Sequence, residues 1–61
     1  MNRRQFLAHL QKCGCHLVRE GSKHSWWGNP TTGARSAVPR HSEINNFLCR
    51  KICKDLGIAV P

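Results

Sequence analysis

Apolar residues near the start of the chain recur at the three- and four-residue spacing of an amphipathic helix. Phe6, Leu7 and Leu10 lie among polar residues, and Gly14 follows at a position suited to a helix C-cap. This spacing predicts a first helix over residues 3–12, which is about three turns long.

A second apolar repeat follows Ser42. Its members are Ile44, Phe47, Leu48, Ile52 and Leu56. Ser42 is a favourable N-cap, and Glu43 stands in the first turn, where the helix dipole favours an acidic side chain. The pattern therefore predicts a second helix that begins at Ser42 and ends at Gly57, and this is the clearest element in the sequence.

The residues between the two helices form short segments that are typical of strands. We expect three antiparallel strands at residues 15–20, 23–28 and 34–38. Gly21 and Ser22 form a turn between the first two strands, and residues 29–33 contain Asn-Pro and Gly, which suit the loop of a hairpin. Pro39 ends the third strand because it has no N–H to continue a ladder.

The order helix, strand, strand, strand, helix predicts an α+β fold. A three-stranded antiparallel sheet needs one face covered, so we expect both helices on the same face. The chain of 61 residues makes one domain, residues 1–61, with a thin core. A chain of this size buries only about 60% of its unfolded surface. The other face of the sheet stays open, and function is expected there.

Charge narrows the choice of partners. Ten Lys and Arg residues stand against three acidic residues, which gives a formal net charge of +7. Nucleic acid, an acidic protein and an anionic membrane surface all fit this charge, and solubility alone is the simpler alternative. Residues 1–12 contain no signal peptide or membrane span. We therefore expect a cytoplasmic protein without a membrane partner, whose cysteines stay reduced.

Four cysteines and four histidines raise the question of a zinc site. Cys13 and Cys15 are too close in sequence for the usual ligand pair, and Cys49 and Cys53 lie on one face of the predicted second helix. Reduced cysteine is frequently buried as a small apolar residue. We expect no metal and no other cofactor. A small zinc-dependent DNA-binding protein is the alternative, which metal analysis would test.

One histidine differs from the others in its surroundings. His24 follows Lys23 and the predicted turn, and it precedes Trp26 and Trp27. An imidazole beside cations and turn amides has the parts needed to cleave RNA, namely a base for the ribose 2′-OH and positive charge for the phosphoryl oxygens. DNA lacks that hydroxyl and is not expected to be a substrate. A bonded or merely exposed histidine is the alternative interpretation.

Neighbouring residues supply candidate RNA contacts. Trp26 and Trp27 are adjacent in a strand and point to opposite faces, so one can enter the core and the other can stack on a base or bind a protein. Partial covering of both rings by helix ends or by the loop is the alternative. The candidate phosphate contacts are Lys23, Arg35 and Arg40. His41 is either a junction histidine bonded to the backbone or one of several candidates for the acid that protonates the leaving 5′-oxygen.

These segments together resemble the HicA family, the mRNA interferases of HicA–HicB toxin-antitoxin modules. The similarity covers nearly the whole chain. It rests on Gly21 to His24 ahead of an aromatic strand, Asn29-Pro30 with Gly33, Val38 to His41, and Ile52 to Ile58. The family fold is α-β-β-β-α and similar to a double-stranded-RNA-binding domain, which agrees with the element order predicted above.

The resemblance also implies roles for individual residues. The family's catalytic histidine closes a Gly-Ser-x-His motif, which corresponds to His24, and many members have a second histidine where this chain has Lys23. The family usually has an aromatic residue at the position of Trp26, which resembles a core position and leaves Trp27 as the exposed ring. The predicted RNA-binding residues are Ser22, Lys23, Trp27, Arg35, Arg40 and His41.

A HicB-type antitoxin is the protein partner that the resemblance implies, and it would cover His24 and the basic surface. The predicted function is a metal-independent endoribonuclease toxin that acts on mRNA. A non-catalytic RNA-binding module of the same fold is the alternative, and it predicts salt-sensitive binding without any product.

Overall fold

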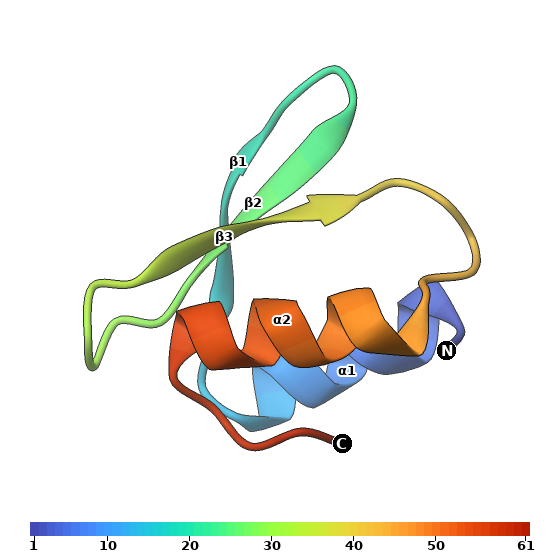
Figure 1. Cartoon of the computed structure of the whole chain (residues 1–61). Helices are drawn as coiled ribbons and strands as arrows, with labels where there is room; N and C mark the ends of the chain where they lie inside the picture. Colours follow the sequence, from blue (N-terminus) through green and yellow to red (C-terminus); the bar gives the residue numbers. More distant parts are fainter.

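The computed structural model describes residues 1–61 and has the predicted order of elements (Figure 1). These elements are α1 (Arg3–Lys12), β1 (His16–Glu20), β2 (His24–Gly28), β3 (Arg35–Pro39) and α2 (Asn46–Leu56). The strands form one antiparallel sheet in the order β1-β2-β3. The predicted α+β class is confirmed, and each strand lies within one residue of its predicted bounds.

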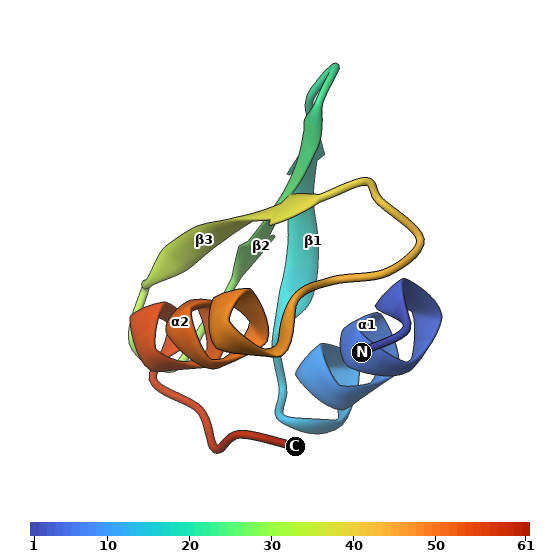
Figure 2. The ribbon, with the colours of Figure 1, turned by 45° about the vertical axis from the view of Figure 1, so that its right-hand side comes forward.

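Both helices lie on the same face of the sheet. Figures 1 and 2 show α1 and α2 side by side in one layer, with the three strands forming the second layer above them. The opposite face of the sheet is left uncovered. The predicted two-layer arrangement with one open face is therefore confirmed.

The core lies between the helices and the sheet. Its buried residues are Phe6, Leu10, Cys15, Trp27, Val38, Ile44, Cys49, Ile52, Cys53 and Leu56. β1 contributes none of them, because all five of its residues are exposed. The register of β1 against β2 shifts between Leu17 and Arg19, which leaves Val18 as a bulge. The sheet is thus anchored to the helices mainly through β2 and β3.

The two tryptophans are placed opposite to the prediction. Trp27 is 4% exposed and belongs to the core, whereas Trp26 is 38% exposed. Strand alternation explains this arrangement, since buried Ser25 and Trp27 point toward the helices while His24 and Trp26 point to the open face. The prediction that Trp27 is the exposed ring is wrong, and Trp27 is not available to stack on a base.

The start of α2 also differs from the prediction, because Ser42 is not its N-cap. The helix begins at Asn46, and Asn45 is the N-cap. The Asn45 side chain accepts a hydrogen bond of 2.7 Å from the amide of Phe47. An asparagine in this position satisfies one of the amides that a helix start leaves unpaired.

Residues 42–45 do not join the helix because the N-terminus holds them. The Ser42 carbonyl accepts a hydrogen bond of 2.8 Å from the Arg3 amide, and the Ile44 amide donates one of 2.8 Å to the Met1 carbonyl. This pairing with a segment far away in the sequence uses the backbone groups in an extended arrangement. The apolar repeat that predicted the second helix therefore begins at Ile44, two residues before the first residue of α2.

Asn29 links the hairpin loop to the end of α2. Its Nδ2 donates to the carbonyl oxygen of Leu56 at 2.8 Å, and its Oδ1 accepts from the Thr31 amide at 3.0 Å. Gly33 closes the same loop with a φ of 76°, in the left-handed region that favours glycine. The Asn-Pro and Gly residues of this loop therefore serve the fold and lie away from His24.

The four cysteines differ in accessibility, which gives a testable prediction. Cys15, Cys49 and Cys53 are buried, whereas Cys13 is half-buried. Burial raises the pKa of the Cys53 thiol to about 11, because it disfavours the charged thiolate that reacts with alkylating reagents. We expect maleimide at neutral pH to label Cys13 first and the other three only on unfolding, as read by mass spectrometry. Rapid labelling of Cys53 in the native protein would contradict the buried placement.

Candidate functional site

His24 stands at the beginning of β2 and is exposed on the open face of the sheet. It pairs with Pro39, the last residue of β3. The next residue, Ser25, is 1% exposed, so the strand backbone is fixed against the helices while the histidine points away from them. The imidazole is therefore presented to solvent from a rigid strand.

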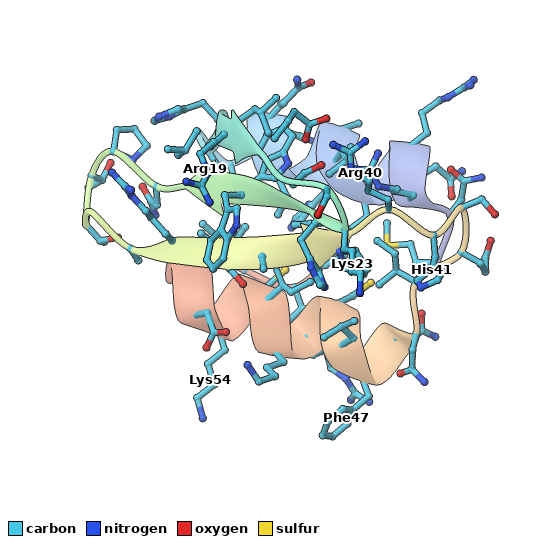
Figure 3. All side chains as sticks on the ribbon, turned by 90° about the horizontal axis from the view of Figure 1, so that it is seen from above. Arg19, Lys23, Arg40, His41, Phe47 and Lys54 are labelled. Atoms are coloured by element: carbon cyan, nitrogen blue, oxygen red, sulfur yellow. The ribbon has the colours of Figure 1, made fainter.

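His24 lies in a hollow open to solvent, which we call the His24 hollow. Its volume is about 380 Å³, and its lining residues are Ser22, Lys23, His24, Pro39, Arg40 and His41. Lys23, Arg40 and His41 lie at the same end of the molecule when the open face is viewed from above (Figure 3). Five residues named from the sequence are thus brought together by the β1–β2 turn and the end of β3.

Arg40 holds the β1–β2 turn beside His24. Its Nη2 donates to the carbonyl oxygen of Gly21 at 2.7 Å and to Glu20 Oε2 at 3.1 Å. The same turn is closed by the Gly21 amide, which donates to the His24 carbonyl at 2.8 Å. Arg40 therefore shares its charge with a carboxylate that the sequence analysis did not consider. Lys23 makes no ion pair, and it supplies unshared positive charge to the hollow.

Arg3 supports the hollow from the helical side and was missed in the sequence analysis. Its Nε donates to the Pro39 carbonyl at 2.9 Å, and its Nη2 donates to Ser25 Oγ at 2.9 Å. Pro39 is the residue that pairs with His24 across the sheet, and Ser25 follows His24 in β2. In the sequence, Arg3 is simply one of many cations, and no local pattern distinguishes it. It is a positioning residue because it holds β2 and β3 at the point where His24 projects.

We expect Arg3→Met to lower the free energy of unfolding by about 1–3 kcal/mol, because it leaves the buried Ser25 hydroxyl and the Pro39 carbonyl without their charged donor. Arg4→Met is the matched control, since Arg4 is exposed and surface changes usually stay within about 0.5 kcal/mol. Urea denaturation measures both variants. Equal stability of the two would show that the Arg3 hydrogen bonds contribute nothing.

Two residues named from the sequence do not lie in the His24 hollow. Arg35 pairs with Gly28 at the far end of β2, four residues along the strand from His24, which corresponds to about 13 Å. Trp27 is in the core. Arg35 instead borders a second hollow on the open face, together with Val18, Arg19 and Trp26.

The remaining histidines lie elsewhere. His16 is exposed at the far end of β1, opposite Gly28. His9 Nε2 lies 2.7 Å from the carbonyl oxygen of Ala59, so this ring fastens the C-terminal tail to α1. No group of three or more His, Cys, Asp or Glu side chains is arranged to hold a metal ion.

The surface charge is largely unpaired. Glu20, Glu43 and Asp55 are the three acidic residues, and all of them form ion pairs. Only Arg40 and Lys51 among the ten Lys and Arg residues take part in these pairs, so eight have no acidic partner. The protein thus offers a surface with strong attraction for a polyanion.

The fold and the site define a small basic α+β protein with an exposed histidine on an open surface. The family model described as the HicA toxin of bacterial toxin-antitoxin systems matches residues 3–58. The chain belongs to this family, and membership implies an antitoxin partner. Comparison with curated proteins and with solved structures gives no match. Neither helix has the length and hydrophobicity needed to cross a bilayer.

Proposed function

We propose that this protein is an endoribonuclease toxin that cleaves mRNA, with His24 as its general base. The observation that supports this function best is the exposed placement of His24 in a hollow lined by Lys23, Arg40 and His41. A histidine suits the role because its ordinary pKa lies near neutral pH, where a base must accept and later release a proton.

The proposed reaction uses the RNA's own hydroxyl as nucleophile. His24 takes the proton from the ribose 2′-OH, and the resulting oxygen attacks the adjacent phosphorus. The bond from phosphorus to the 5′-oxygen of the next nucleotide then breaks, and that oxygen is protonated as it leaves. The products are a 2′,3′-cyclic phosphate and a free 5′-hydroxyl. A strand without the 2′-OH has no nucleophile, so DNA is spared.

The hollow also provides groups to hold the phosphate. Lys23 carries a charge that is not shared with an acid, and the Ser22 and Lys23 amides donate no hydrogen bond within the chain. Free amides and a cation at one turn stabilise the charge that develops on the phosphoryl oxygens. His41 is exposed in the same hollow and is our candidate for the acid that protonates the leaving oxygen.

Inhibition by a HicB-type antitoxin is the second part of the proposal. The hollow is open and shallow, so a folded protein laid over this end of the sheet would exclude RNA from His24. The excess of unpaired cations favours rapid capture by an acidic partner. Adding the antitoxin to the purified toxin is expected to stop cleavage at equal molar amounts of the two chains.

The direct test is product analysis with matched strands. We expect the purified protein to cleave unstructured RNA in the presence of EDTA, to leave a 2′,3′-cyclic phosphate, and to spare the same sequence made of 2′-O-methyl nucleotides. Mass spectrometry of the fragments identifies the ends. Salt-sensitive binding without any cleaved product would instead support the non-catalytic RNA-binding module.

A further inference from the structure

The open face of the sheet has a second hollow beyond that of His24, and its residues form what we call the Trp26 platform. Its volume is about 380 Å³, and its lining residues are Val18, Arg19, Trp26 and Arg35. Trp26 is 38% exposed, which is unusual for so large an aromatic side chain on a sheet. The proposed reaction at His24 does not use any of these residues.

Two small neighbours, Ala37 and Gly21, leave the Trp26 indole accessible. Trp26 pairs with Ala37 on one side and with Arg19 on the other. A Cβ placed on Gly21 would lie 4.0 Å from Trp26 Nε1, so the indole reaches toward the turn that precedes His24. The ring therefore occupies the part of the open face between Arg19 and the His24 hollow.

The two arginines of the platform are free to bind an anion. Neither Arg19 nor Arg35 forms an ion pair, in contrast to Arg40, which is shared with Glu20. Both are exposed and come from the strands on either side of Trp26, Arg19 from β1 and Arg35 from β3. An exposed indole between unpaired guanidinium groups suits a nucleotide, since the ring stacks on a base and the cations hold phosphate.

The platform is also correctly placed with respect to His24. Trp26 and His24 are two residues apart on one strand and on the same face, which corresponds to about 7 Å. A strand of RNA whose phosphate lies at His24 can therefore bring the base of an adjacent nucleotide over Trp26. The bases of a duplex are stacked on one another and are not available to such a ring.

We propose that Trp26, Arg19 and Arg35 form a nucleotide subsite for single-stranded RNA. The base next to the cleaved phosphate stacks on the indole, and the phosphate beyond it lies between the two arginines. The position of this nucleotide relative to the cleavage point rests on the proposed function of His24, whereas the binding itself does not. The subsite makes unpaired RNA, in preference to duplex RNA, the substrate class.

The test measures binding to a strand that cannot be cleaved. Fluorescence anisotropy with a labelled, unstructured 2′-O-methyl oligonucleotide is expected to show that Trp26→Leu weakens binding by about 5- to 150-fold, the usual effect of losing one stacked base. Trp26→Phe keeps an aromatic ring and is expected to retain most of the affinity. Trp27 then remains as the single tryptophan, and its buried emission reports that each variant is folded.

Phe47→Leu is the matched control, because Phe47 is an aromatic residue that is 73% exposed and lies on α2, away from the open face (Figure 3). This variant is expected to bind the oligonucleotide as the unchanged protein does. Arg19→Gln and Arg35→Gln are each expected to weaken binding and to reduce its dependence on salt. An equal loss in Phe47→Leu would overturn the proposal, because the effect would not be specific to the platform.

A strand of abasic sugar-phosphate separates stacking from a structural effect. The unchanged protein and Trp26→Leu are expected to bind this strand equally, because it has no base to stack. Unchanged affinity of Trp26→Leu for the normal oligonucleotide would overturn the proposal. So would a preference of the unchanged protein for duplex RNA, or a Trp26→Leu variant that binds RNA normally and escapes only the antitoxin. Cleavage by His24→Ala would remove the proposed reaction and leave this binding result intact.

Discussion

We expect His24→Ala to lower the rate of RNA cleavage by about 10²- to 10⁴-fold, the usual contribution of a positioned general base. The variant is expected to fold normally, because His24 is exposed and its side chain makes no hydrogen bond within the chain. Expression of the variant is therefore expected to leave cell growth unaffected while the unchanged toxin arrests it. Cleavage of a labelled RNA under single-turnover conditions measures the rate.

His16→Ala is the matched control for this experiment. His16 is also an exposed histidine of the open sheet, but it lies opposite Gly28 at the other end of β2. Its replacement is expected to leave the rate unchanged. If His24→Ala retained the full rate, or if both variants lost activity to the same degree, His24 would not be the base and the proposed mechanism would be wrong.

The second large effect is expected on stability, from a substitution of Trp27, the core residue that was predicted from the sequence to be exposed. Trp27→Ala is expected to lower the free energy of unfolding by about 3–5 kcal/mol, as truncation of a buried aromatic residue usually does. The cost is expected at the lower end, because the buried Trp27 Nε1 has no hydrogen-bond partner and its removal relieves a penalty of about 1–3 kcal/mol. A domain of this size has only about 3–9 kcal/mol of stability, so the variant is expected to lose a third or more of it and to unfold at a markedly lower temperature.

Trp26→Ala is the control variant for Trp27→Ala. Trp26 is on the open face and is 38% exposed, so its truncation is expected to cost less than about 1 kcal/mol. Thermal unfolding followed by circular dichroism compares the two variants with the unchanged protein. The reverse order of stability would restore the placement in which Trp27 is exposed and Trp26 is in the core.

An open site on a thin domain has a consequence for control of the toxin. The His24 hollow is open to solvent, and its lining residues are all polar or charged apart from Pro39. Under the proposed function, a bound partner therefore controls access to His24, and the family implies an antitoxin partner. Under the proposed function, the unpaired cations attract both RNA and an acidic inhibitor.

Local sequence signals were sufficient for most of the fold. The spacing of Phe6 and Leu10 predicted α1, and the turn residues between the strands placed all three strands within one residue of their observed bounds. These elements are specified by short-range periodicity and turn chemistry, which a sequence displays directly. Alternation along β2 could also have predicted which tryptophan is exposed. His24 and Trp26 are two residues apart and lie on the same face, so an exposed His24 requires an exposed Trp26.

Long-range contacts account for what the sequence analysis missed. Asn45 caps α2 instead of Ser42 because the backbone of Met1 to Arg3 pairs with residues 42–44. Arg3 supports the hollow because α1 is packed beneath Ser25 and Pro39. Nothing in the residues next to Ser42 or Arg3 reveals these partners, since they lie tens of residues away.

The order of the elements, the excess of positive charge and the choice of His24 as the candidate residue all follow from the amino-acid sequence. These depend on residue types and on spacing within a few positions. The packed fold is needed to see that Arg40 and His41 line one hollow with His24, that Arg35 lies with Trp26 and Arg19 instead, and that Trp27 belongs to the core. Such placements depend on which strand ends meet and on which face the helices cover, and packing settles both.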